Sequence, residues 1–257
     1  MSGPAAPLWR RTAAEGLGTA LLVTVVVGSG IAAASLSPGD IGLQLLENAF
    51  ATALGLAVLI LALGPVSGAH FNPVVSLVDW WLGHRTGSGL TLHDIAAYLP
   101  AQIIGAVAGA ILANLMYGET AVSWSTTDRS SGHLWLAEVV ATAGLILLIF
   151  ALARTGRAAL APAAVGAYIG AAYWFTSSTS FANPAVTIGR AFSDTFAGIA
   201  PGSVPAFVFF QFFGGIVGAG LLAVLYPDAG QAADDVVISH PETAASPIDS
   251  KTTGATT

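Results

Sequence analysis

The sequence predicts an all-α membrane protein with six transmembrane helices and two re-entrant half-helices, arranged as two inverted repeats of three spans. Three observations support this fold class. Of the 257 residues, 54% are hydrophobic and 9% are charged, whereas about a quarter of the residues in a soluble domain are charged. Six apolar runs approach the roughly 20 residues that a helix needs to cross a bilayer. Two motifs, Asn72-Pro73-Val74 and Asn183-Pro184-Ala185, each open an apolar segment too short to cross.

The predicted elements follow from the apolar runs and the polar segments between them. The six spans are expected near residues 12–34, 44–64, 95–117, 134–153, 161–178 and 204–226, and the half-helices near residues 72–82 and 183–193. Residues 1–11 are expected to form a cytoplasmic amino terminus, and residues 12–226 the membrane domain. Residues 227–257 are rich in Asp, Ala, Ser, Thr and Pro, a composition that predicts a disordered cytoplasmic tail.

Matching residues in the two halves define the repeats, which extend over about residues 12–117 and 134–226. The corresponding residues are Ala14, Glu15 and Thr19 with Ala137, Glu138 and Thr142, and Gln102, Gly105, Gly109 and Tyr117 with Gln211, Gly214, Gly218 and Tyr226. Because each half contains three spans, the second half enters the membrane from the opposite side, which makes the repeats inverted. Interrupted segments at corresponding positions of inverted repeats indicate a translocation site near the midplane of the bilayer.

The first apolar run has two interpretations. Arg10-Arg11 followed by an apolar stretch fits a cleaved signal peptide. Glu15 interrupts that stretch, and its counterpart in the second half favours a retained first span. With the amino terminus inside, five arginines are cytoplasmic, namely Arg10, Arg11, Arg85, Arg154 and Arg157. Only Arg129 and Arg190 then lie outside or in a pore mouth, so the positive-inside rule predicts a multi-pass protein of the cell (inner) membrane with both termini cytoplasmic.

The loops before the two Asn-Pro motifs are predicted to line a wet path. Non-helical backbone at membrane depth is tolerated only where it lines water or packs against protein. The carbonyl groups of these loops would then form a ladder of acceptors along the path, at Gly68, Ala69 and His70 and at Ser178 and Thr179. Asn72 and Asn183 would cap their half-helices and turn amide donors toward the lumen. Both half-helix N-termini place partial positive charge at the centre, which opposes cations and protons.

The segment Ser67-Gly68-Ala69-His70-Phe71-Asn72-Pro73, the Ala-Glu pairs of the first and fourth spans, and Ala101-Gln102-x-x-Gly105-Ala106 resemble the aquaporin and aquaglyceroporin (major intrinsic protein) family. The resemblance covers about residues 12–226. It implies a passive channel that assembles as a homotetramer with one pore per subunit. The expected partners are small neutral solutes and the lipid bilayer. No cofactor, metal or nucleic acid is expected, and no nucleophile–base pair indicates an enzyme.

The family spacing places a selectivity filter at four positions, namely Thr52, Ala171, Ser180 and Val186. Val186 stands where the family usually has an arginine, so the filter is expected to be wide and uncharged. Arg190 lies one helical turn further on the same face. It either supplies the missing charge at a broader mouth or is simply a last-turn arginine stabilised by the helix C-terminus, and the second interpretation is favoured. Val74 replaces the usual alanine, and packing explains it better than a narrower pore.

These features predict a passive channel for small neutral solutes, including water and glycerol-like polyols. A bacterial branch of the family with arsenic-resistance functions carries the same run, Phe181–Ile188, which suggests arsenite and methylated arsenicals as further solutes. A conventional water and glycerol facilitator is one alternative. A proton-coupled secondary transporter that uses Glu15 or Glu138 is another, because buried acids often mark proton sites. Their symmetric placement favours support of the loops, since such acids in the family accept hydrogen bonds from the pore loops.

Overall fold

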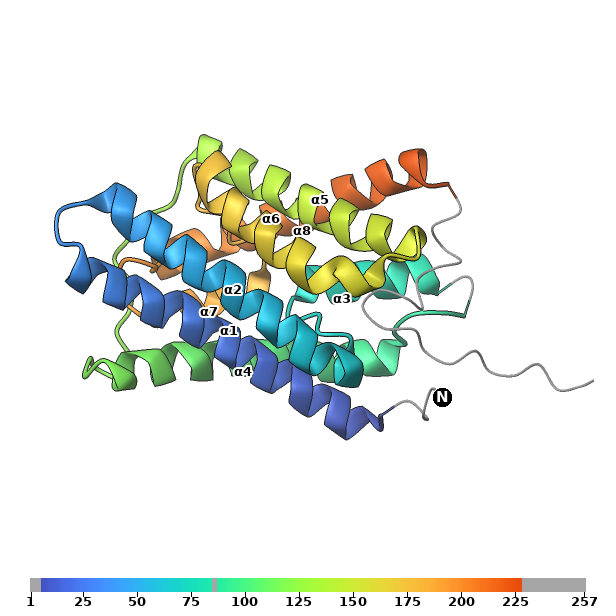
Figure 1. Ribbon diagram of the computed structural model, residues 1–257, viewed down its shortest axis with the longest axis horizontal. Helices are drawn as coiled ribbons and strands as arrows, with labels where there is room; N and C mark the ends of the chain where they lie inside the picture. The colour runs from blue at the N-terminus through green and yellow to red at the C-terminus, as the bar shows by residue number, and fades with distance from the viewer. Residues whose placement is uncertain (1–5, 85–86, 228–257) are drawn as a thin grey trace, which may run out of the picture.

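A computed structural model describes residues 6–84 and 87–227, and every regular element in these ranges is helical (Figure 1). The helices are α1 Leu8–Leu36, α2 Ile41–Ser67, α3 Pro73–Gly83, α4 Leu92–Met116, α5 Gly132–Arg154, α6 Ala161–Phe175, α7 Pro184–Arg190 and α8 Val204–Leu225, with short 3-10 turns at Ala158–Leu160 and Pro201–Ser203. Six of the described helices are long and apolar enough to cross a membrane. Apart from residue 227, the predicted tail lies outside the described residues.

The predicted fold class is confirmed, and the helix ends differ by a few residues from expectation. α1 begins at Leu8 instead of near residue 12, so that Arg11 lies in the helix and its Nη2 contacts Asp94 Oδ1 at 2.6 Å. Asp94 also closes a capping box with Thr91 at the start of α4. α6 ends at Phe175, three residues before the predicted end, because Thr176 already has extended backbone.

The two halves of the chain pack in the same way. α1 packs against α2 and α4, and α5 packs against α6 and α8. Contacts between α2 and α6 join the halves, and the short helices α3 and α7 lie between the spans (Figure 1). Both short helices contact α4 and α8, so each is held by both halves. The middle of the molecule is therefore built from two half-helices instead of one continuous span.

Small residues allow the helices of each half to approach closely. A Cβ atom added at Gly105 of α4 would lie 2.2 Å from the Gly16 carbonyl oxygen of α1. A Cβ atom added at Gly214 of α8 would lie 2.7 Å from the Val139 carbonyl oxygen of α5. Such close contacts between backbones are a common basis of helix association in membranes.

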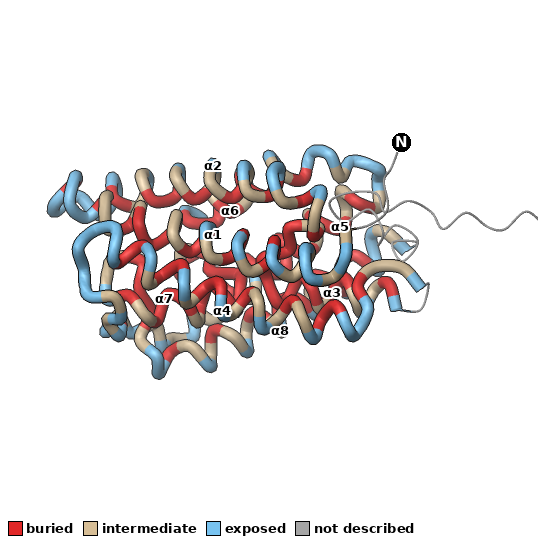
Figure 2. The backbone as a smooth tube through the Cα atoms, turned by 90° about the horizontal axis from the view of Figure 1, so that it is seen from below, coloured by how far each residue is buried: buried red, intermediate tan, exposed pale blue. Residues whose placement is uncertain are grey.

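Burial separates the interior from the outer faces of the helices (Figure 2). Buried residues follow the helix faces that look toward the middle, while the outer faces carry exposed apolar side chains such as Leu61, Ile216 and Val224. Exposed apolar side chains over full-length helices are suited to lipid. The polar groups that form the candidate site lie inside.

Candidate functional site

The two loops that precede the short helices share an unusual backbone conformation. Ala69 and Phe71 have φ angles of 49°, and the corresponding Ser180 and Ala182 have φ angles of 48°. Residues other than glycine rarely occupy this left-handed region, and each costs of order 1–3 kcal/mol. The same strain at matching positions of both loops requires matching interactions that hold it.

Glu15 holds the first loop from α1. Its carboxylate accepts hydrogen bonds from His70 N at 3.0 Å and Phe71 N at 2.7 Å, and from the side chains of Ser67 at 2.7 Å and Gln102 at 2.8 Å. The side chain is fully buried and does not line the cavity described below. Four donors on one carboxylate fix the orientation of the loop amides.

Glu138 holds the second loop from α5 in the same manner. It accepts from Phe181 N at 3.0 Å, from Ala182 N at 2.8 Å and from Gln211 Nε2 at 2.6 Å. Gln211 also donates to Thr187 Oγ1 at 2.8 Å, which ties the carboxylate to α7. Both acids therefore support the backbone of a loop, and neither side chain lines the cavity.

The two asparagines cap their own helices and bind the opposite loop. Asn72 Oδ1 accepts from Val74 N at 3.0 Å, while its Nδ2 donates to the Ala182 carbonyl at 2.8 Å. Asn183 Oδ1 accepts from Ala185 N at 3.0 Å, and its Nδ2 donates to the Phe71 carbonyl at 2.7 Å. Pro73 and Pro184 occupy the first helical position, where no backbone N–H is needed. The N-termini of α3 and α7 are thus joined at the centre.

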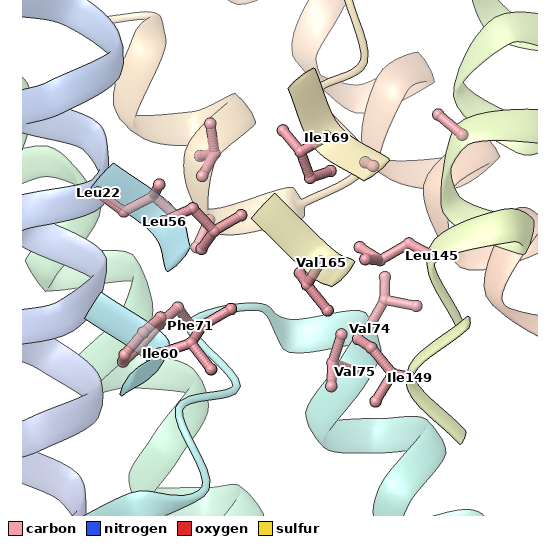
Figure 3. Packing of buried hydrophobic residues seen from close by; sticks show 14 of the residues in the cluster. Leu22, Leu56, Ile60, Phe71, Val74, Val75, Leu145, Ile149, Val165 and Ile169 are labelled. Carbon is pink, nitrogen blue, oxygen red and sulfur yellow. The ribbon is translucent and has the colours of Figure 1, made fainter. Parts of the chain in front are cut away.

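One cavity follows both loops through the interior. Its loop residues are Ala69, His70, Phe71, Asn72, Ser180, Phe181, Ala182 and Asn183. Apolar side chains of α1, α2, α5 and α6 form much of the remaining wall, and Figure 3 shows Leu22 and Leu56 on one side, Leu145 and Ile149 on the other, and Val165 between them. A few polar groups thus face a mostly apolar cavity, which is the usual character of a site for small molecules.

Arg190 lies at one end of this cavity, hereafter the Arg190 end. It is the last residue of α7, is only 2% exposed and lines the cavity beside Val186. Its Nε donates to the Ala197 carbonyl, and its guanidinium carbon lies 3.4 Å from the centre of the Phe181 ring. Arg190 is a last-turn arginine, as the sequence indicated, and its guanidinium is bound to the following loop and lines the cavity. Whether its charge replaces the missing filter arginine stays a prediction.

A second arginine reaches the same ring from the loop between α4 and α5. Arg129 Nε donates to the Gly198 carbonyl at 3.0 Å, and its guanidinium carbon lies 4.9 Å from the Phe181 ring centre. Burial lowers the pKa of this guanidinium, and the Glu138 carboxylate opposes that shift. The sequence indicated only that Arg129 lies outside or in a mouth, since nothing in its neighbours shows that the loop folds back over Phe181.

Comparisons with known proteins agree with this arrangement. The family model described as "Major intrinsic protein" matches residues 4–182. The aquaglyceroporin AqpS of Rhizobium meliloti (strain 1021) is 49% identical over 222 residues, which cover 86% of this chain and 92% of that protein. The lens fiber major intrinsic protein of Gallus gallus is 31% identical, with 96% of each chain covered. The chain belongs to the major intrinsic protein family.

A solved structure shows the same fold. The X-ray structure of the aquaglyceroporin from Plasmodium falciparum superposes with a TM-score of 0.64 at 19% identity, over 88% of this chain and 100% of that chain. The major intrinsic proteins are membrane channels and not enzymes, so this chain is a multi-pass channel protein.

The positions expected for the filter of a major intrinsic protein lie at the Arg190 end, with one correction. Thr52, Ser180 and Val186 line the cavity. Ala171 is exposed on the outer face of α6 and does not line it. Tyr173 takes its place, since it lines the cavity and its hydroxyl lies 3.2 Å from Thr52 Oγ1. Helix periodicity could have found Tyr173, because Val165, Ile169 and Tyr173 recur every four residues on one face of α6.

Three of the expected loop residues lie behind the cavity wall. Gly68 forms the left-handed cap of α2, and Ser178 is fully buried, with its hydroxyl accepting from Ser180 N at 3.2 Å. Thr179 also does not line the cavity. Phe71, Phe181 and Ala182 of the same loops also face the cavity.

Val74 and Ala185, which follow the two Asn-Pro pairs, are buried in the core and do not line the cavity. Val74 faces α8, because a Cβ atom added at Gly215 would lie 2.5 Å from Val74 Cγ1. The larger residue in the first motif therefore fills space next to a glycine. Packing accounts for it, as the sequence favoured.

Proposed function

We propose that this chain is a passive channel for small neutral solutes, with water and glycerol-like polyols as the basic set. The observation that carries the proposal is a cavity lined by both re-entrant loops, with Asn72 and Asn183 each on its wall and each bound to the opposite loop. Half-helix N-termini at the centre disfavour cations, while loop carbonyls accept hydrogen bonds from hydroxyl groups. The 49% identity to a protein named as an aquaglyceroporin supports the same solute class.

The proposed filter consists of Thr52, Tyr173, Ser180 and Val186. No arginine directly follows the second motif, and Arg190 contributes its charge one turn further along α7. The side chain of Val186 leaves more room at this level of the cavity than an arginine side chain would. For this reason the proposed solutes include arsenite, a compact neutral molecule with hydroxyl groups, and methylated arsenicals, which are bulkier neutral molecules.

Proton-coupled transport is the less favoured function. Glu15 and Glu138 are the acids that it would need, and the four and three donors bound to them keep both carboxylates engaged. A coupling site must exchange protons with the solute path, whereas neither acid lines the cavity. Accumulation of solute against its gradient would favour coupling over a channel.

The proposed setting is the cell (inner) membrane, with both termini cytoplasmic, the Arg190 end outward, and a homotetramer as the assembly. The chain contains no cysteine, so single cysteines introduced at Gly118 and Gly156 give a clean test of orientation. A membrane-impermeant maleimide added to intact cells should label position 118 and spare position 156. Chemical cross-linking of the purified protein should give a ladder that ends at four subunits.

Swelling of proteoliposomes tests the solute class. Separate gradients of glycerol, arsenite and a methylated arsenical should each give faster swelling than in empty liposomes, with no effect of an uncoupler. Equal rates in loaded and empty liposomes for every solute would overturn the channel. Flux of glycerol without flux of arsenicals would leave the conventional facilitator as the function.

A further inference from the structure

The Arg190 end of the cavity contains two guanidinium groups around one aromatic ring. The Phe181 ring centre lies 3.4 Å from the guanidinium carbon of Arg190 and 4.9 Å from that of Arg129, so the two carbons lie within about 8 Å of each other. Consecutive carbonyls, those of Ala197 and Gly198, accept from the two arginines. The shared ring and the shared segment hold two like charges close together.

The two guanidiniums of this cluster have no direct carboxylate partner in the described part of the chain. No described acidic residue forms an ion pair with Arg129 or Arg190. Carboxylates of the same region accept hydrogen bonds from other groups. Glu138 accepts from the loop amides, and Asp128 accepts from Ser130 N at 3.1 Å and Ser203 Oγ at 3.0 Å. Asp194 accepts from Thr126 N at 2.8 Å and Thr126 Oγ1 at 3.0 Å. None of these carboxylates forms a direct ion pair with either arginine.

Two polar side chains on this cavity have donors with no partner among the described residues. Only Nε of Arg190 is hydrogen-bonded to a described residue, although the side chain is 2% exposed and lines the cavity. The hydroxyl of Ser180, 3% exposed and on the same cavity, is buried without a hydrogen-bond partner. Buried polar groups are normally satisfied, so unpartnered donors beside a cavity indicate a place where a ligand or water completes them.

We propose that the Arg190 end binds a small carboxylate anion, held by the terminal nitrogens of Arg190 with the Ser180 hydroxyl, while Arg129 supplies a second charge. A carboxylate matches the planar fork of a guanidinium with two parallel hydrogen bonds. Low polarity around the cavity strengthens this pairing and makes an uncompensated guanidinium costly. Because the site lies in the solute path, a bound carboxylate obstructs neutral solutes.

Binding can be measured without any flux, by fluorine NMR of trifluoroacetate mixed with the purified full-length protein in neutral detergent. Trifluoroacetate remains ionised throughout the neutral pH range, and trifluoroacetamide is its neutral match. The trifluoroacetate resonance should broaden and should sharpen again on addition of formate, whereas trifluoroacetamide should show no more broadening than with detergent alone. Equal broadening of both probes would overturn the proposal.

Variants locate the site. Arg190→Gln should raise the dissociation constant for trifluoroacetate at least about tenfold, the usual effect of losing a charge-assisted hydrogen bond. Arg190→Lys should fall between the parent and Arg190→Gln, and Arg129→Gln should weaken binding less than Arg190→Gln. The matched control is Arg157→Gln, which removes an exposed arginine from the turn between α5 and α6. If Arg190→Gln does not elute from gel filtration as a single species, trifluoroacetate binding by Arg190→Lys and Arg129→Gln tests the site instead. Unchanged binding in both variants would overturn the proposed site.

Block of solute flux presupposes the channel function proposed above, whereas the NMR result does not. Trifluoroacetate on both sides of the membrane should slow glycerol-driven swelling of the parent and of Arg157→Gln, and trifluoroacetamide should not. Arg190→Gln should lose this inhibition. Binding by NMR with undiminished glycerol flux would overturn the placement in the solute path, and failure of glycerol flux without any anion would count against the channel function alone.

Discussion

The two re-entrant loops have nearly the same scaffold and differ in what they present to the cavity. In both, a fully buried glutamate accepts two backbone N–H groups, a glutamine joins that glutamate to the short helix, and an asparagine reaches the opposite loop. Two residues before the asparagine, however, the first loop has His70 and the second has Phe181. Seven residues after it, the first has Asp79 and the second has Arg190.

These differences separate the parts of the repeat that hold the loops from the parts that give each loop its own contacts. Asp79 accepts from Leu90 N at 2.8 Å and does not line the cavity, whereas Arg190 does. His70 Nδ1 lies 3.1 Å from Ser76 Oγ, while Phe181 contacts two arginines. The scaffold therefore obeys the two-fold repeat, and the chemistry of the cavity ends departs from it.

Exchange of each glutamate for glutamine should give the largest effects, and unequal ones. Each oxygen of Glu15 accepts two hydrogen bonds, so Glu15→Gln sets its new NH₂ group against two donors in either orientation. The glutamine of Glu138→Gln can turn its NH₂ group toward Phe181 N, and the loop then loses only one hydrogen bond. With about 1–3 kcal/mol for each buried donor left unpaired, Glu15→Gln should cost about twice as much as Glu138→Gln. Thermal unfolding in detergent gives the order, and a larger cost at Glu138 would contradict the count of donors.

Substitution of the close-packing glycines should give the second-largest loss of stability. Gly105→Ala drives a methyl group to 2.2 Å from a carbonyl oxygen, and Gly214→Ala to 2.7 Å, so α4 must shift further from α1 than α8 from α5. Overpacking of this kind costs about 1–3 kcal/mol, with the first-half variant nearer the upper limit. Apparent melting temperatures of the two purified variants test the order. Gly220, whose added Cβ atom would meet nothing within 4 Å, is the control position.

Arginine at matching positions after the two asparagines should affect the solutes differently. Val75 and Val186 occupy the third position after Asn72 and Asn183, and both line the cavity. Val186→Arg places a guanidinium near Tyr173 and Thr52, so glycerol flux should fall about tenfold or more while water flux falls less, a selectivity equivalent to about 1.4 kcal/mol. Val75→Arg adds charge at the opposite half and serves as the comparison. Equal loss of water and glycerol in Val186→Arg would contradict the filter assignment.

The smallest effect is expected at Val74. Val74→Ala should reduce stability by about 1–2 kcal/mol through lost packing and leave glycerol flux unchanged, because the side chain faces Gly215 and not the cavity. The double variant Val74→Ala/Gly215→Ala should recover part of the stability lost by Gly215→Ala alone. A change in the ratio of glycerol to water flux in Val74→Ala would show that residue 74 acts on the pore after all.

The fold could be predicted from the sequence because the residues that repeat in the two halves are those that hold the helices and loops together. Glu15 with Thr19, and separately Gln102 with the glycines of α4, recur in the second half with the same internal spacing, and apolar runs set the spans. Helix ends were less predictable, since loop conformation decides them: Thr176 turns to extended backbone, although the expected span continued to residue 178.

The cavity ends could be predicted only in part. Ser180 and Val186 flank Asn183 in the sequence, and the family spacing places both of them, with Thr52 of α2, on the cavity. The same spacing fails at Ala171, because this residue lies on a different face of α6 from the cavity-lining Val165, Ile169 and Tyr173. Arg129 depends on contacts between two loops about 70 residues apart, such as Arg129 Nε with the Gly198 carbonyl, and no local pattern encodes such a contact.

The reciprocal asparagine bonds also constrain how the protein is made. Asn72 pairs with a carbonyl 110 residues later in the chain, and Asn183 with one 112 residues earlier. Before the second half is present, the Phe71 carbonyl and the Asn72 Nδ2 lack these partners, and only contacts within the first half, such as those of Glu15 and Tyr98, hold the strained loop. Buried backbone groups require partners, and these two bonds can form only once both halves are present. The centre of the cavity is therefore the part of the fold that neither half can complete by itself.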